Sequence, residues 1–163
     1  MALCVRSARI DPIDDIELRD LLMLVYRDGG FTDSERAETI FEPAAVRARG
    51  EILYEDGANE GLLGMVIVVP PTSSAAQFAQ AGECEMQLLA TAPRVQRAGI
   101  GRALLKAAME RAQSDGFIRM LLWTQLAMHA AQRLYESSGF TRIPERDFKR
   151  LGRDFLFFEA TLI

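Results

Sequence analysis

The sequence predicts an α/β (α+β) fold in which a mixed central sheet of about seven strands is flanked by about four helices. Apolar segments follow one another in the order strand, helices, three strands, helix, strand, helix and two strands. The second half passes twice from strand to helix to strand, which requires right-handed crossovers and at least one parallel pair of strands. A length of 163 residues, with no repeat and no linker-like segment, predicts one domain over residues 1–163.

The chain begins with a short, partly alternating segment, Leu3 to Ile10, which predicts the first strand. A helix is expected next, because Asp11 can cap it and Pro12 suits its first turn. The apolar residues that follow have the helical spacing i, i+3, i+4 and i+7, at Leu18, Leu21, Leu22 and Val25.

Residues 31–50 are less regular and predict one or two short helices, with Ser34 as a candidate cap and Pro43 as a second start. Two apolar runs of strand length follow, at residues 51–55 and 62–69, on either side of a turn-rich connector. This pattern predicts an antiparallel pair of strands, followed by a loop over residues 70–82.

The next strand, Glu83 to Thr91, alternates along its whole length. Its expected core face carries Cys84, Met86, Leu88 and Ala90, and its partly wet face carries Glu83, Glu85, Gln87, Leu89 and Thr91. The remaining predicted elements are a helix over 99–115, a strand over 119–124, a helix over 128–138, and strands over 141–143 and 155–162.

Composition narrows the function classes. Hydrophobic residues make up 49% of the chain and the formal net charge is −4, which argues against a nucleic-acid partner. No run approaches eighteen apolar residues, so we expect a cytoplasmic protein with no membrane partner. Cys4 and Cys84 are eighty positions apart without metal-ligand spacing, so we expect no metal site.

The stretch from Glu83 to Gly101 combines a strand, a proline-marked turn and a glycine-bearing entrance to a helix. Such an arrangement presents backbone N–H groups to an anion and predicts a phosphate-binding turn. A dinucleotide-binding G-x-G-x-x-G fingerprint is excluded, because its third glycine position is Leu104.

Two motifs carry a family resemblance. Gln96-Arg97-Ala98-Gly99-Ile100-Gly101 follows Leu89-Ala90-Thr91-Ala92-Pro93, and Ala131 to Phe140 reads AQRLYESSGF downstream. This combination resembles the GNAT superfamily of acyl-CoA-dependent N-acetyltransferases over roughly residues 62–140. The resemblance implies a mostly antiparallel sheet and acetyl-CoA as the co-substrate.

The resemblance also implies which residues hold acetyl-CoA. The pantetheine arm would lie along the backbone of Leu89, Ala90 and Thr91. The pyrophosphate would be bound by the turn and the first helical residues, namely Gln96, Arg97, Ala98, Gly99, Ile100, Gly101 and Arg102. The chain departs from the family at Met128, where many relatives carry an Asn that contacts the pantetheine region.

Acetyl transfer to an amine needs a route for two protons. Glu85 is the candidate base for the amine, and the alternatives are a water path for that proton and a solvated or salt-bridged role for the carboxylate. Tyr135 occupies the position of the family's general acid, where it would hydrogen-bond or protonate the leaving thiolate.

The acceptor is expected to be a primary amine on a small molecule or peptide, bound by residues 26–38 and 144–153 as in the family. Four acidic residues there either attract a cationic amine or form a solvated surface, namely Asp28, Asp33, Glu35 and Glu38. The alternative function is an acyl-CoA-binding sensor or interaction module with weak catalysis. A homodimer is compatible with either function.

Overall fold

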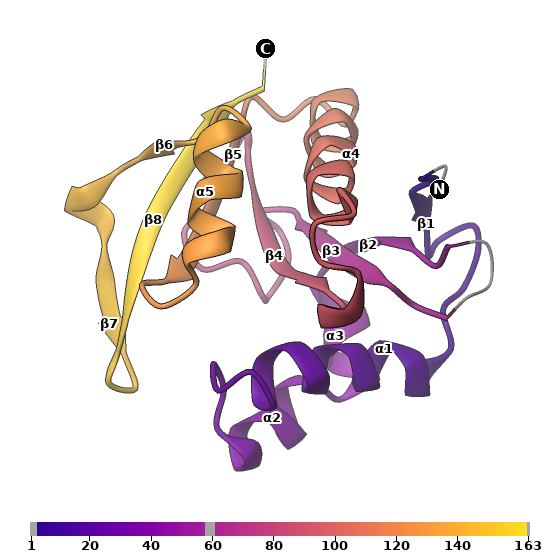
Figure 1. The fold of residues 1–163 in the computed structure, drawn as a ribbon. Helices are drawn as coiled ribbons and strands as arrows, with labels where there is room; N and C mark the ends of the chain where they lie inside the picture. The colour runs from indigo at the N-terminus through magenta and orange to yellow at the C-terminus, as the bar shows by residue number, and fades with distance from the viewer. Residues whose placement is uncertain (1–2, 58–60, 163) are drawn as a thin grey trace.

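The computed structural model describes residues 3–57 and 61–162. Its core is one eight-stranded sheet in the order β1-β2-β3-β4-β5-β8-β6, with β7 paired to β8 (Figure 1). The strands are β1 (Arg6–Ser7), β2 (Glu51–Glu55), β3 (Gly64–Val69), β4 (Glu83–Thr91), β5 (Arg119–Gln125), β6 (Thr141–Arg142), β7 (Phe148–Arg150) and β8 (Arg153–Thr161). The predicted α/β class with a mostly antiparallel mixed sheet is confirmed.

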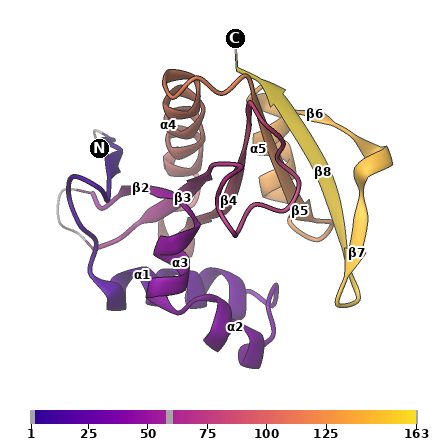
Figure 2. The same cartoon turned by 180° about the vertical axis from the view of Figure 1, so that it is seen from behind.

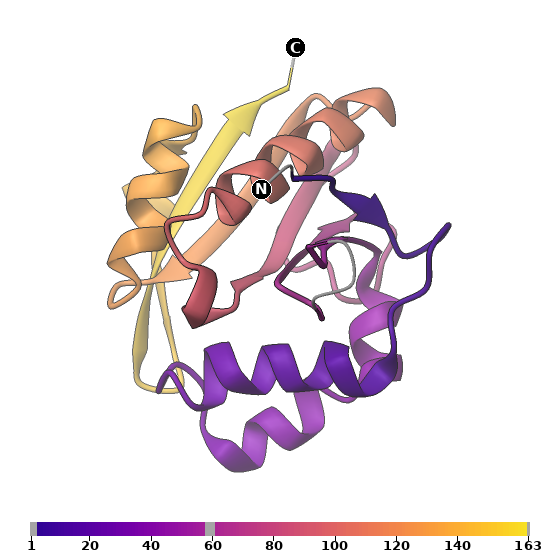
Figure 3. The same cartoon turned by 45° about the vertical axis from the view of Figure 1, so that its right-hand side comes forward.

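Five α-helices cover the two faces of this sheet. Helices α4 and α5 lie over one face, and the other face packs against α1, α2 and α3; in Figure 2, α3 lies in front of the strands and α1 and α2 lie below them. In Figure 3, α1 and α2 run along the lower edge of the molecule. The bounds are α1 (Asp15–Leu22), α2 (Ser34–Ile40), α3 (Pro43–Arg49), α4 (Ile100–Ser114) and α5 (His129–Ser137).

Strands β4 and β5 form the parallel pair that the crossover rule predicts. Only three residue pairs join them, from Glu83 opposite Arg119 to Glu85 opposite Leu121. Beyond these pairs the strands diverge, which is visible in Figure 1 between α4 and α5. The centre of the sheet is therefore open at one end, and the backbone there is available to a ligand.

A β-bulge in β4 corrects the predicted alternation of that strand. Met65 pairs with Ala90 and Ile67 pairs with Gln87, so Leu88 and Leu89 together oppose one residue of β3. Leu88 has a φ of 54°, in the left-handed region. Residues after Gln87 therefore change faces, and the prediction that Leu88 and Ala90 share a face with Cys84 and Met86 is wrong.

The first helix begins later than predicted. Asp14 has an extended backbone (φ −62°, ψ 137°), and its carboxylate accepts the N–H groups of Ile16 at 3.0 Å and Glu17 at 3.1 Å. Asp14, rather than Asp11, is therefore the cap, and Pro12 lies outside the helix. The helix continues without a break into a π-helical turn, η1 (Met23–Arg27).

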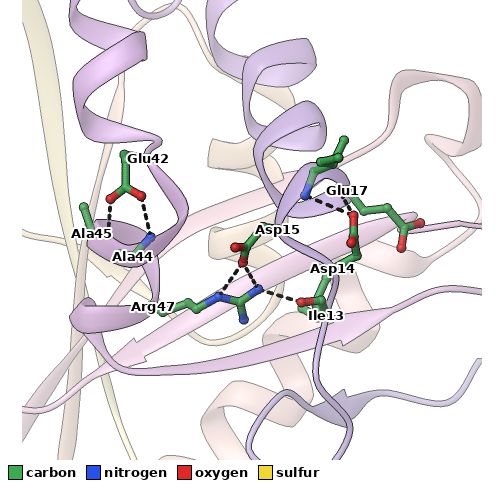
Figure 4. A network of polar contacts seen from close by, with 9 residues as sticks. Ile13, Asp14, Asp15, Glu17, Glu42, Ala44, Ala45 and Arg47 are labelled. Atoms are coloured by element: carbon green, nitrogen blue, oxygen red, sulfur yellow. Dashed lines mark hydrogen bonds and ion pairs between the residues drawn. The ribbon is translucent and has the colours of Figure 1, made fainter.

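Helices α1 and α3 are joined by polar contacts that Figure 4 shows. Arg47 donates to the Asp15 carboxylate at 2.6 Å and to the Ile13 carbonyl at 2.6 Å. Glu42 caps α3 through both oxygens, and Pro43 is its first residue, as predicted. These contacts fix α3 against the start of α1.

Helix α2 begins at Ser34, so this residue lies one position inside the helix and is not its cap. Asp33 holds the N-cap position, with φ −64° and ψ 145°, but its carboxylate makes no capping bond. It pairs instead with Arg153 of β8 at 3.4 Å. This pair joins the start of α2 to the far side of the open sheet.

Strand β7 was not predicted from the sequence. It forms a hairpin with β8 through Leu151 and Gly152, whose φ values are 52° and 76°. Two consecutive positive φ values are typical of a type I′ turn. The strand has three residues, FKR, and two of them are basic, so it carries too little apolar alternation to be recognised.

Glu51 is the basis of a pH-dependent prediction. Its buried carboxylate accepts from Ser7 Oγ at 2.6 Å and from Arg111 Nε at 2.8 Å, and it thus joins β1, β2 and α4. Burial by itself raises the pKa of Glu51, but these two donors and Arg9 lower it below its ordinary value. A lowered folded pKa contributes stability above the unfolded pKa, and this contribution is lost as the pH falls through the folded pKa.

We therefore expect Glu51→Gln to lower the free energy of unfolding by about 2 kcal/mol at pH 7 and by clearly less at pH 3. Urea unfolding at both pH values measures the difference. Glu110→Gln removes an exposed carboxylate of an i, i+4 pair with Lys106 and is the matched control. Equal losses at both pH values for Glu51→Gln would contradict the assignment.

Candidate active site

A cavity of about 200 Å³ lies where β4 and β5 diverge. Its lining comes from η1, the start of α2, the end of α3, both diverging strands and the β7–β8 hairpin. It therefore receives residues from both regions that the family resemblance assigns to the acceptor, 26–38 and 144–153. Tyr135 of α5 reaches the same cavity.

Tyr135 is 5% exposed and packs against Phe140 and Phe158, with ring centroids 5.9 and 5.7 Å away. Burial raises the pKa of Tyr135 well above its ordinary value, so the hydroxyl stays protonated at all physiological pH values. It makes no hydrogen bond with any residue that the structure describes. The α5 motif thus places a neutral hydrogen-bond donor in the cavity wall.

Tyr26 is a second tyrosine of the cavity, and sequence reasoning missed its role. Its hydroxyl donates to the carbonyl of Leu89 at 2.9 Å, directly after the bulge of β4. Burial also raises the pKa of Tyr26. The only signal in the sequence was its place at the edge of the expected acceptor region, since the contact depends on the π-helical turn.

Glu85 has a structural role that argues against the expected base role. The side chain is fully buried, and its Oε2 accepts three backbone N–H groups of the preceding loop at 2.6–2.8 Å. Its Oε1 accepts from the Gln87 amide at 2.9 Å. Glu85 does not line the cavity. The carboxylate is therefore neither solvent-exposed nor part of an ion pair, which were the two alternatives expected from the sequence. Instead it anchors the loop over residues 70–82.

The start of α4 has the features of an anion-binding turn. Gly99 at the N-cap has φ 84° and Arg97 has φ 73°, and no side chain caps the helix. The first N–H groups of a helix have no partner within it, so here they remain available. Gln96, Arg97, Ala98 and Gly99 are exposed, whereas the Ile100 side chain is buried in the core and only its backbone faces the turn.

Strand β4 and helix α4 meet beside this turn. A Cβ added at Gly101 would lie 3.4 Å from Leu134 and 3.5 Å from the Thr91 hydroxyl oxygen. Thr91 and Ala90 pair with β3, and Ala90 is buried. The structure therefore brings together the strand end and the glycine turn, which the resemblance assigns to one cofactor.

Arg102 makes a contact with α5. Its guanidinium donates to the Ser137 hydroxyl at 3.1 Å and joins α4 to α5. Met128 lines the cavity at the N-cap of α5, and this helix has no side-chain cap. The departure from Asn therefore places an apolar thioether in the wall where relatives carry an amide.

Three of the four acidic residues near the cavity form ion pairs with arginines. Asp28 pairs with Arg27 and Glu38 pairs with Arg19, while Glu35 is exposed. Among the residues that the structure describes, Asp33 is the one acidic residue that lines the cavity, and it pairs with Arg153. The lining contains four arginines, Arg36, Arg49, Arg150 and Arg153, so the cavity carries excess positive charge.

Over residues 3–57 and 61–162, no group of three or more His, Cys, Asp or Glu side chains could hold a metal ion. In the same ranges, no helix has both the length and the apolar character needed to cross a bilayer.

The sequence matches the model of the Acetyltransferase (GNAT) family over residues 16–140. N-acetyltransferase family 8 member 3 of Rattus norvegicus is 31% identical over 84 residues, which are 52% of this chain and 36% of the relative. The chain thus spans about a third of the length of that curated relative.

Solved structures share the fold over nearly the whole chain. A GNAT acetyltransferase from Staphylococcus aureus Mu50 has a TM-score of 0.75 at 14% identity and covers 99% of this chain and 100% of its own. An acetyltransferase from Bacillus subtilis in complex with CoA has a TM-score of 0.71 at 19% identity, with coverages of 99% and 100%. The family model spans most of the sequence, and the fold agrees with it. The chain belongs to the GNAT acetyltransferase family.

Proposed function

We propose that the protein transfers the acetyl group of acetyl-CoA directly to a primary amine. The observation that carries this proposal is the continuity of three features: the uncapped start of α4, the divergence of β4 from β5, and the cavity with Tyr135 in its wall. Together they provide a site for an anion, an open strand edge and a buried hydrogen-bond donor.

Acetyl-CoA fits these features in order. The pyrophosphate lies at the start of α4, where Gly99 and Gly101 leave the backbone accessible. The pantetheine arm follows Leu89 to Thr91 along the open edge of β4. Its thioester then reaches the cavity between Tyr26 and Tyr135. The CoA-bound relative from Bacillus subtilis supports the choice of cofactor.

In the reaction the neutral amine attacks the thioester carbonyl, a C–N bond forms, the C–S bond breaks, and the CoA thiolate leaves. The nitrogen then releases its remaining extra proton to water to give the amide, and the thiolate takes up a proton from solvent. Tyr135 donates a hydrogen bond to the leaving sulfur. Its raised pKa makes full proton transfer to a thiolate less favourable than for an ordinary phenol, so stabilisation by hydrogen bonding is the main contribution.

The amine must lose a proton first, and this costs roughly 4–5 kcal/mol at pH 7 for an alkylamine. Because Glu85 is committed to the loop, we propose that water takes this proton.

The direct test is calorimetry of the purified protein with acetyl-CoA, followed by a free-thiol assay with a panel of amines. Submicromolar to micromolar binding and amine-dependent thiol release support the proposal. Absence of acetyl-CoA binding, in both calorimetry and thermal melting, would refute it. Binding without turnover on any amine would favour the alternative function, an acyl-CoA-binding module.

Gly101→Ala tests the donor site. The added methyl meets Leu134 and Thr91 at ordinary contact distances, and the backbone there is helical, so the fold should tolerate it. We expect the dissociation constant for acetyl-CoA to rise about tenfold, because the methyl occupies the approach to the N–H groups. Calorimetry measures the change. An unchanged constant would move the pyrophosphate away from this turn.

A further inference from the structure

We propose that the acceptor amine carries an anionic group, a carboxylate or a phosphate, which Arg36 and Arg49 bind at one end of the cavity. This inference rests on the proposed acetyl transfer and names the chemical class of its acceptor. The observations that carry it are the placement, burial and partners of these two side chains.

The arginines of α1, η1, α2 and α3 divide into two groups. Outside the cavity, Arg19 pairs with Glu38, Arg27 with Asp28, and Arg47 with Asp15. The two that line the cavity, Arg36 and Arg49, pair with no carboxylate of the described residues. Every guanidinium of this region thus has an acidic partner except those that face the cavity.

Arg49 is the more buried of the two. Its Nη1 donates to Gln87 Oε1 at 2.9 Å, and the Gln87 amide nitrogen donates in turn to Glu85 and to the Ala75 carbonyl. Glu85 reaches Arg49 only through this amide, because its own oxygens bind the loop and Gln87. A neutral amide orients the guanidinium but leaves its charge uncompensated, which is costly for a partly buried group.

Arg36 adds a second positive charge close to the first. Both side chains line the same cavity, and burial lowers the pKa of Arg49, with Tyr26 acting in the opposite direction and Arg36 adding to the lowering. Two mutually repelling cations on one cavity wall are stabilised by an anion between them. Guanidinium groups bind carboxylate and phosphate oxygens in paired, geometrically defined hydrogen bonds.

The other two arginines of the lining are already engaged. Arg153 donates to the Gly30 carbonyl and to Gln125, and it pairs with Asp33. Arg150, like Arg49, donates to a neutral amide, that of Gln77 at 2.6 Å, but its guanidinium also lies over the Phe148 ring, which holds it on the β7–β8 hairpin. The anion is therefore assigned to Arg36 and Arg49.

The position of this pair orients the acceptor. Arg49, Tyr26 and Tyr135 line the same cavity, and the Tyr26 hydroxyl donates to the Leu89 carbonyl of β4. An acceptor with its anionic group at Arg49 can direct its amine past Tyr26 toward the thioester. A cavity of about 200 Å³ suits a small molecule of amino-acid size.

The test compares three forms of each amine in a panel: with a free carboxylate, with that carboxylate as a neutral amide, and with a phosphate in its place. Activity is measured by thiol release, and binding is measured by calorimetry in the presence of CoA. For the wild-type protein we expect kcat/KM for one anionic form to exceed that of the neutral amide about tenfold or more. The anionic form with the higher kcat/KM shows whether the site prefers a carboxylate or a phosphate.

Arg36→Gln and Arg49→Gln should each reduce this ratio about tenfold, through KM rather than kcat, with the dissociation constant for acetyl-CoA unchanged. Arg19→Gln is the control, because it removes the same charge from α1 outside the cavity. Arg36 is exposed on α2, so its variant keeps the test informative if Arg49→Gln folds poorly.

Equal use or equal binding of the anionic and neutral amines by the wild-type protein would overturn the inference and leave the acetyl transfer intact. Loss of the preference in Arg19→Gln as well would also overturn it, because the effect would then be one of net charge. Failure to bind acetyl-CoA would refute the proposed transfer separately. The calorimetric comparison of the amines would then still decide whether the cavity selects anions.

Discussion

Replacing Tyr135 with Phe is expected to lower kcat about 100-fold while the dissociation constant for acetyl-CoA changes by less than about threefold. The phenol lies in the cavity wall, and its raised pKa keeps it protonated as a hydrogen-bond donor. In the proposed transfer, loss of this donor removes the hydrogen bond to the departing thiolate in a buried site, where such a bond is worth more than in water. Steady-state kinetics and calorimetry measure the two quantities.

The fold should not be affected by Tyr135→Phe, because the ring keeps its packing against Phe140 and Phe158. Tyr54→Phe is the matched control, since that hydroxyl donates to the Asp11 carbonyl at 2.8 Å, away from the cavity. We expect the control to lose about 1 kcal/mol of stability and no kcat. Equal losses of kcat and acetyl-CoA affinity in Tyr135→Phe would contradict the donor role.

Glu85→Gln separates a structural carboxylate from a catalytic base. The native carboxylate accepts three backbone N–H groups through Oε2 and the Gln87 amide through Oε1. Bonds to an ionised acceptor contribute about 1.5–3 kcal/mol each, and a neutral amide retains part of them. We therefore expect the free energy of unfolding to fall by about 3 kcal/mol, while kcat of the folded enzyme changes by less than about threefold.

Urea unfolding and kinetics on the same preparation test this expectation for Glu85. General bases contribute about 10²–10⁴-fold to a rate. A kcat reduced by such a factor with unchanged stability would restore the base role and remove the need for a water path. Gln87, which links Glu85 to Arg49, keeps its bond to the Ala75 carbonyl in the variant, so the cavity wall should persist.

The sequence determined the main elements because their signals are local. The apolar period of α4, its final glycine at Gly116 and the apolar runs of strand length at β2 and β3 predict elements that the structure confirms. The first helix was misplaced by three residues, since Asp11 and Asp14 are equally good caps by composition. The structure decides between them: Asp14 makes the capping bonds, and Arg47 binds Asp15 and the Ile13 carbonyl on either side of it.

The sequence was less informative about side-chain roles in β4. The expected alternation assumed a regular strand, whereas the bulge at Leu88 reverses the faces of every later residue. A bulge has no strong local signal in the run from Glu83 to Thr91, because its cause is the pairing with β3. The same pairing places Glu85 under the preceding loop.

By itself, the sequence determined the family, and it predicted a phosphate-binding turn at Gly99 and Gly101 and a catalytic role for Tyr135, since each depends on a contiguous motif. The tertiary structure decided the rest. It places Arg36, Arg49, Tyr26 and Tyr135 around one cavity, and it buries Glu85 outside the lining of that cavity. The physical reason is the sequence separation of the residues involved. A motif consists of residues that are neighbours in the chain, whereas the charge of a cavity depends on residues from distant segments that only folding brings together.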